Sequence, residues 1–165
     1  NEIPQLRRAE DADCLRCCGR EGLLPPQRHR GAEVTQRKTS EELNALTEKV
    51  IGAAIHVHRE LGPGLLESTY SECLAIELKD CCLHADREVT IPLRYKNVTV
   101  ESAYRLDFIV EDTIIIECKA VEQLLPIHSA QVLTYLKLTN KKLGLLINFN
   151  VEVLHKGIKR IANGF

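Results

Sequence analysis

The spacing of apolar residues near the middle of the chain first follows the period of a helix. From Thr39 onward, apolar residues recur at every third or fourth position and form one stripe: Leu43, Leu46, Val50, Ala54, Val57 and Leu61. Thr39-Ser40-Glu41-Glu42 has the form of a capping box, and Gly62-Pro63-Gly64 is a helix stop. The pattern therefore predicts one helix over 40–61 and a second over 66–82.

After Asp86 the period falls to two, which is typical of strands. The alternating apolar positions are Val89, Ile91, Leu93 and Tyr95. Lys96-Asn97 is a predicted turn into a short second strand over 98–100.

The C-terminal half contains longer apolar runs that predict buried elements. Residues 104–110 and 113–120 are two predicted strands, and Ile114-Ile115-Ile116 indicates that the second of them is buried on both faces. A helix over 126–138 and a buried strand over 143–149 follow, and then a short terminal element over 156–165. The predicted order is ααββββαβ, so the fold class is α/β.

Residues 1–38 differ from the rest of the chain. They hold seven Arg and one Lys and show no sustained apolar period. We therefore predict an atypical N-terminal extension over 1–38 and one folded domain over 39–165.

Composition limits the classes of function. No run of about 18 apolar residues is present, so we expect no membrane span and a cytoplasmic protein. The net charge of -1 excludes a broad cationic surface, so nucleic-acid binding would have to be local or mediated by a metal. Seven cysteines, an odd and scattered set, favour reduced thiols, and Cys14, Cys17 and Cys18 lack a fourth partner at metal-binding spacing.

Three charged residues on adjacent predicted strands are the candidate chemistry. If the turn between these strands is centred near Asp112, Asp107 lies opposite Glu117 across the hairpin. Because side chains alternate along a strand, Glu117 and Lys119 share one face and Cys118 points to the other. Asp107, Glu117 and Lys119 are thus predicted to converge.

Two adjacent carboxylates repel each other and lose solvation, so a divalent cation is the natural way to stabilise them. Hard oxygen ligands suit Mg²⁺ or Mn²⁺, and a neighbouring lysine can orient a water and offset charge on a phosphate. The structural alternative is an exposed hairpin with a cross-strand ion pair and no catalytic role. The three isoleucines that precede Glu117 argue against it, because they place the site in the interior.

Gly64-Leu65-Leu66-Glu67-Ser68-Thr69-Tyr70 matches the pattern G-x-x-E-x-x-Y. With Asp107, Glu117-x-Lys119 and the Gln131-x-x-x-Tyr135 pattern, the chain from Leu43 to Phe165 resembles the bacterial GxxExxY branch of the PD-(D/E)xK nucleases. The resemblance implies a restriction-endonuclease-like αβββαβ core, in which a mixed central sheet is flanked by helices. It also implies a metal at the D…ExK site.

Further roles are implied by the same resemblance. Glu67 would be a further metal or water ligand, and Gln131 would hydrogen-bond near the metal or the lysine. Tyr70, His128 and Tyr135 would contact substrate. Each has a structural alternative: Glu67 as a helix-terminal charge, and Tyr135 as part of a helix face packed on the sheet. His58, beside the apolar stripe of the first helix, is predicted to be a hydrogen-bonded core residue.

The predicted function is hydrolysis of phosphodiester bonds in nucleic acid, with DNA favoured over RNA. A domain of this size is small for holding duplex DNA alone, which favours a homo-oligomer or a partner protein. The alternatives are a non-catalytic binding or assembly module that retains the nuclease fold and, less favoured, a metal-cluster protein that uses the cysteines.

Overall fold

The computed structural model describes residues 39–164 of the chain. The N-terminal extension predicted over 1–38 and the cysteines at 14, 17 and 18 lie outside the described residues. Along the described part the elements are α1 (Ser40–Leu61), α2 (Glu67–Asp80), β1 (Ala85–Tyr95), β2 (Val98–Val110), β3 (Ile114–Lys119), α3 (Pro126–Thr139), β4 (Leu143–Asn148), η1 (Leu154–Gly157) and β5 (Ile158–Ala162).

Helix α1 begins and ends at the residues that the sequence pattern predicts. The backbone N–H of Thr39 donates to Glu42 Oε2 at 2.7 Å, and the Glu42 N–H donates to Thr39 Oγ1 at 3.2 Å, so the capping box is present. The helix ends at Gly62, whose φ of 68° is accessible to glycine at little cost. His58 is buried, and its Nε2 lies 2.7 Å from the Val151 carbonyl oxygen, which confirms the prediction of a core histidine.

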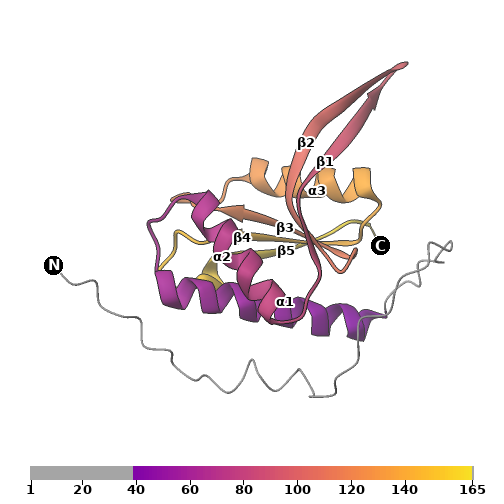
Figure 1. Ribbon diagram of the computed structural model, residues 1–165. Helices are drawn as coiled ribbons and strands as arrows, with labels where there is room; N and C mark the ends of the chain where they lie inside the picture. Colours follow the sequence, from indigo (N-terminus) through magenta and orange to yellow (C-terminus); the bar gives the residue numbers. More distant parts are fainter. Residues whose placement is uncertain (1–38, 165) are drawn as a thin grey trace. The chain divides into compact units, whose positions relative to one another are not determined.

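The five strands form one mixed sheet in the order β1-β2-β3-β4-β5, with β3 and β4 parallel and the other neighbours antiparallel. Helices α1 and α2 cover one face of the sheet and α3 covers the other (Figure 1). The predicted α/β fold with a mixed central sheet between helices is confirmed.

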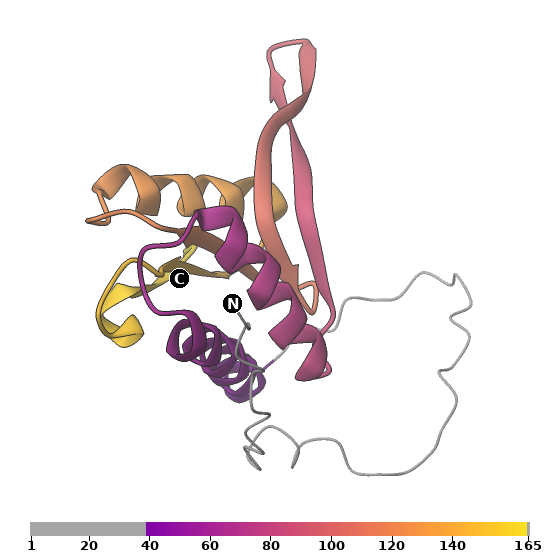
Figure 2. The same cartoon turned by 60° about the vertical axis from the view of Figure 1, so that its left-hand side comes forward.

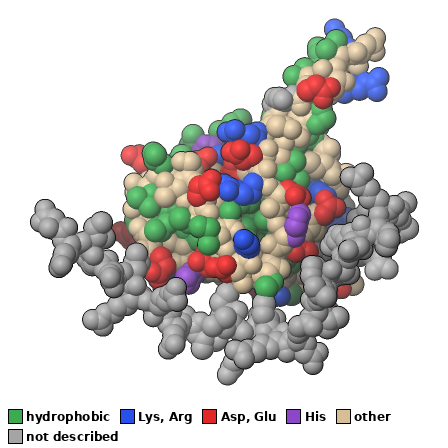
Figure 3. All heavy atoms as spheres, viewed as in Figure 1, with side chains coloured by type: hydrophobic (Ala, Val, Ile, Leu, Met, Phe, Trp, Pro, Cys, Tyr) green, Lys and Arg blue, Asp and Glu red, His purple; other side chains and the backbone are tan. Residues whose placement is uncertain are grey.

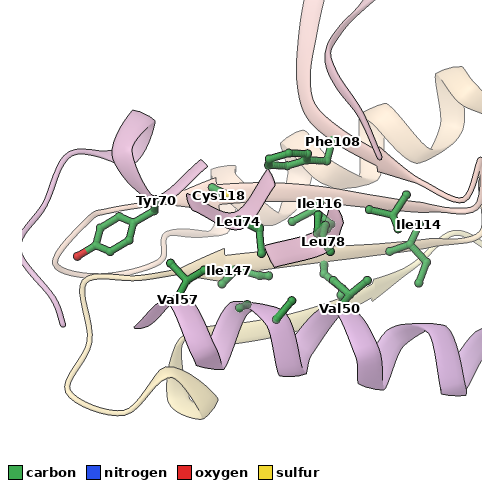
Figure 4. Packing of buried hydrophobic residues seen from close by; sticks show 14 of the residues in the cluster. Val50, Val57, Tyr70, Leu74, Leu78, Phe108, Ile114, Ile116, Cys118 and Ile147 are labelled. Carbon is green, nitrogen blue, oxygen red and sulfur yellow. The ribbon is translucent and has the colours of Figure 1, made fainter. Parts of the chain in front are cut away.

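The larger core lies between the sheet and helices α1 and α2. Val50 and Val57 of α1 and Leu74 and Leu78 of α2 pack towards β3, which contributes Ile114, Ile116 and Cys118 (Figure 4). Ile115 faces the second core, under α3. Strand β3 is therefore buried on both faces, as the three isoleucines predict, and forms the rigid base of the site.

The hairpin of β1 and β2 is longer than predicted. The two separate strands expected over 98–100 and 104–110 form one continuous strand, β2, and β1 begins at Ala85. The apolar period is interrupted at residues 101–103, where the register with β1 shifts between Ile91 and Leu93, so β2 continues through a bulge or similar irregularity. Both views show the far end of the hairpin projecting beyond the rest of the domain (Figures 1 and 2).

The terminal element is also more ordered than the sequence pattern shows. It consists of η1 and of strand β5, which closes the sheet by pairing antiparallel with β4. Among residues 39–164, no helix has the length and apolar character needed to cross a membrane.

Candidate active site

The candidate site begins where strands β2 and β3 stop pairing. Their ladder contains Phe108 with Ile116, Ile109 with Ile115 and Val110 with Ile114, which is the predicted register around Asp112. The connection between Val110 and Ile114 has three residues, and two of them, Glu111 and Asp112, have a positive φ of 50°.

Beyond the last pair, the side chain of Asp107 replaces the backbone as hydrogen-bond acceptor. Its Oδ2 accepts from the Cys118 N–H at 2.8 Å, which fixes the Asp107 carboxylate against β3 beside Glu117. The place where β2 departs from the sheet is thus also where the carboxylates meet.

Lys119 links strand β3 to helix α2 at this point. Its Nζ lies 2.6 Å from Glu117 Oε1 and 3.5 Å from Glu67 Oε1, at the first turn of α2. Cys118, between the two charged residues of β3, is buried in the core on the opposite face. Alternation along a buried strand therefore aims Glu117 and Lys119 at the site, as predicted.

Glu117 is the most unusual group of the site, because it is a carboxylate with only 3% of its surface exposed. Its Oε2 is buried with no hydrogen-bond partner, while Oε1 is held by Lys119. Burial, and then the nearby charge of Asp107, raise the pKa of Glu117 to about 7 despite the opposing effect of Lys119. A buried acceptor without a donor is costly unless something binds it.

The other two charges of the site are shifted by the same surroundings. Burial raises the pKa of Asp107, although the Cys118 N–H and Lys119 act against it. Burial acts to lower the pKa of Lys119, but its hydrogen bond to Glu117 and the charges of the other carboxylates outweigh burial, so this pKa is raised. Lys119 is therefore held in its ammonium form beside acids that resist ionisation.

On α3, Gln131 and Tyr135 form a pair one helical turn apart. The Gln131 amide donates to the Tyr135 hydroxyl, and the Tyr135 ring packs edge-on against Tyr104 of β2, with centroids 5.6 Å apart. Tyr135 is only 2% exposed and packs on the sheet, and its contact with the substrate backbone stays a prediction. Among the described residues, Gln131 makes no hydrogen bond to a carboxylate of the site.

His128 lies at the start of the same helix and is partly buried. Its Nδ1 accepts from the Leu125 N–H at 3.2 Å, which caps the helix. This contact uses one ring nitrogen and leaves the substrate-binding role of His128 a prediction.

The structure gives Tyr70 a structural role, and its contact with substrate stays a prediction. The side chain is fully buried, its hydroxyl donates to the Gly62 carbonyl at 2.6 Å, and the Leu65 N–H donates to that hydroxyl at 3.1 Å. The ring stacks on Phe149, with centroids 4.6 Å apart. Tyr70 therefore holds the loop that leads into Glu67.

Two residues at the C-terminal end of β4, Asn148 and Phe149, support the site without being apparent from sequence spacing. The Phe149 N–H donates to the Lys119 carbonyl at 2.8 Å. Asn148, with 1% exposure, accepts from the Val121 N–H at 3.0 Å and donates to its carbonyl at 2.8 Å. A polar residue at the end of a fully apolar strand was the one available signal for Asn148.

Comparison with known families assigns the chain. The family model described as the PD-(D/E)XK nuclease superfamily matches residues 44–161, which is more than half of the chain. The chain belongs to the PD-(D/E)XK nuclease superfamily. No curated protein and no solved structure matches it.

Membership in this superfamily indicates a nuclease type of function and a nucleic-acid substrate, and PD-(D/E)XK nucleases generally use divalent metals. Three residues of the motif that gives the superfamily its name are present at the site. Asp107 matches the first acid, and Glu117 and Lys119 match the E-x-K pair. The proline of the name is replaced here by Leu106, which is buried under α3. Within residues 39–164, no three acidic, histidine or cysteine side chains are already gathered as closely as a bound metal would hold them.

Proposed function

We propose that this protein is a metal-dependent nuclease that hydrolyses phosphodiester bonds of DNA at the site formed by Asp107, Glu117 and Lys119. The observation that carries the proposal is Glu117, a buried carboxylate with an unpartnered oxygen beside a second buried acid. Within a nuclease superfamily, this arrangement is best explained as a binding site for a cation and a phosphate.

The donor set fits Mg²⁺ or Mn²⁺. Asp107 and Glu117 offer hard carboxylate oxygens, and Glu67, with 44% of its side chain exposed, lies at the open side where it can move inward as a further ligand. When bound, the cation would neutralise the acids, polarise the phosphate and lower the pKa of a coordinated water.

Lys119 supplies the positive charge that would act on the phosphate from the protein. Its pKa is raised by its contact with Glu117, so it acts as an ammonium that holds a water by hydrogen bonding and offsets negative charge developing on the phosphate. The Phe149 N–H holds the Lys119 carbonyl, and the Asn148 side chain holds Val121, two residues further along the chain. Such preorganisation means that little reorientation is required during the reaction.

The remaining assignments follow from the same site. Gln131, on the α3 side, would hydrogen-bond to the substrate or to a metal-bound water, and His128 would contact the substrate backbone. The match to G-x-x-E-x-x-Y supports membership in the GxxExxY branch. The proposal includes a cytoplasmic protein that acts on DNA as a homo-oligomer. Residues 39–165 would be the catalytic domain and residues 1–38 an extension to it.

The test is an activity screen of the purified protein on single-stranded, duplex and branched DNA, with RNA as a comparison, in Mg²⁺, in Mn²⁺ and in chelator. We expect cleavage that requires the metal and is lost in the Asp107→Asn variant. Metal-independent cleavage, or no cleavage of any substrate under any condition, would refute the proposal, and the second outcome would favour a non-catalytic binding module.

A further inference from the structure

The far end of the β1–β2 hairpin is a surface that the catalytic site does not use. We call residues 93–101 the arm. Every side chain from Arg94 to Glu101 is exposed, and both views show this part of the ribbon standing clear of the helices (Figures 1 and 2). We propose that the arm is a DNA-gripping element that binds duplex at a distance from the cleaved bond; this inference rests on the proposed function.

Strand register gives the arm two different faces. Leu93 pairs with Val100 and Tyr95 with Val98, so these four side chains share an apolar face. Arg94 pairs with Thr99 on the other face. The arm is therefore an amphipathic two-stranded ribbon.

The tip of the ribbon carries a net positive charge, although the chain as a whole does not. Arg94 and Lys96 outnumber Glu101 within the arm, whereas the whole chain has a net charge of -1. Figure 3 shows basic side chains at the projecting end. Lys96 also lies 5.4 Å from the centroid of the Tyr95 ring, which is 65% exposed. A cation next to an exposed aromatic ring can bind a DNA phosphate while the ring contacts the adjacent sugar or base edge.

The shape of the arm also suits a nucleic-acid groove. A two-stranded ribbon is narrow enough to enter the major groove of B-DNA, and apolar side chains can contact the thymine methyl groups there. Isolated two-stranded hairpins are marginally stable in water, so a partner that covers the apolar face would also steady the arm.

A second copy of the chain fits the arm less well than DNA does. The apolar face offers four side chains, whereas a stable protein interface buries about 800 Å² on each partner and uses about 20–30 residues a side. Two like-charged tips would also repel each other if arms packed tip to tip. DNA needs only a few phosphate contacts from the arm, because the catalytic site supplies others.

The arm and the site lie on the same strand, which sets a distance between them. Val98 precedes Asp107 by nine residues along β2, so the two are separated by at most about 30 Å. At about 3.4 Å per base pair, this corresponds to roughly nine base pairs of duplex. Duplexes that do not extend this far from the site cannot reach the tip of the arm.

The experiment measures affinity for fluorescent duplexes of about 8 and about 30 base pairs, in chelator and over a range of salt concentrations. It compares the full chain with the double variant Arg94→Ala, Lys96→Ala and with the control double variant Lys156→Ala, Lys159→Ala, which removes two exposed cations elsewhere. Because no cleavage occurs in chelator, binding is scored separately from the proposed activity.

For the longer duplex, we expect the arm variant to make the slope of log affinity against log salt shallower by about 2, and to lose on the order of tenfold in affinity at low salt. The control variant and the shorter duplex should show much smaller changes. An arm variant that matches the control variant on the longer duplex overturns the inference. So does a wild-type dimer that Tyr95→Ser and Val98→Ser convert to monomers without changing DNA affinity. Arm-dependent binding by a protein that never cleaves would leave the arm assignment in place and refute the nuclease proposal.

Discussion

Replacing Glu117 by Gln removes the charge that the fold accommodates least well. Glutamine keeps the shape and the contact with Lys119 but cannot ionise. In the metal-free protein we expect the variant to be more stable than wild type at pH 8, because the ionised Glu117 is buried with one oxygen unpartnered.

The magnitude and the sign follow from the pKa of Glu117, which rises from 4.5 in the unfolded chain to about 7 in the fold. An acid whose pKa is raised on folding binds more protons in the folded state, so it opposes folding as pH rises. The penalty is absent below about pH 4.5, grows through the interval, and is fully present above pH 7. A shift of this size corresponds to roughly 3 kcal/mol of unfolding free energy.

The assay is urea denaturation in chelator at pH 5 and at pH 8, for wild type, Glu117→Gln and the control Glu122→Gln, whose carboxylate is exposed. The stability difference between Glu117→Gln and wild type should increase by roughly 2–3 kcal/mol from pH 5 to pH 8, while the control should track wild type. A stability difference between Glu117→Gln and wild type that does not change with pH would refute the claim that burial disfavours the ionised form of Glu117.

Three further predictions concern other parts of the domain. Calorimetry should detect Mn²⁺ binding to wild type and not to the double variant Asp107→Ala, Glu117→Ala; equal binding would remove these residues from the metal site. Tyr70→Phe should lower the unfolding free energy by about 1–3 kcal/mol, because it leaves the Gly62 carbonyl without its donor, and should leave DNA affinity unchanged. A large loss of DNA affinity at unchanged stability would show that Tyr70 contacts the substrate. A chain that begins at Lys38 should retain a cooperative melting transition, since the capping box of α1 is complete from Thr39; a non-cooperative melt would show that the extension is part of the fold.

The parts of the fold set by local chemistry could be predicted from the sequence. The capping box at Thr39 and the glycine at 62 gave the ends of α1, and three consecutive isoleucines gave a strand buried on both faces. The register of the β2–β3 hairpin also followed, because a tight turn fixes which residues face each other. The meeting of Asp107, Glu117 and Lys119 was thus predictable from strand geometry.

Other features depend on long-range contacts that a pattern of residues does not encode. Tyr70 occurs in a motif that resembles a functional signature, but its hydroxyl is used by Gly62 and Leu65 and its ring by Phe149. Strand β2 continues through residues 101–103 although its register with β1 shifts there, between Ile91 and Leu93, and no apolar pattern in the sequence signals this. Similarly, Asn148 holds the segment after Lys119 through its hydrogen bonds to Val121, which is 27 positions away in the sequence.

The central claim is that Lys119, next to two carboxylates, takes part in metal-dependent cleavage of nucleic acid. The most direct measurement is the rate of Mg²⁺-dependent cleavage of a labelled DNA by wild type and by Lys119→Ala, purified in parallel so that any contaminating nuclease is common to both. We expect wild type to cleave only with metal and the variant to be slower by on the order of 10²-fold or more, with Mn²⁺ binding retained, because the ammonium acts on charge that develops in the transition state. Equal rates for the two proteins would contradict the account.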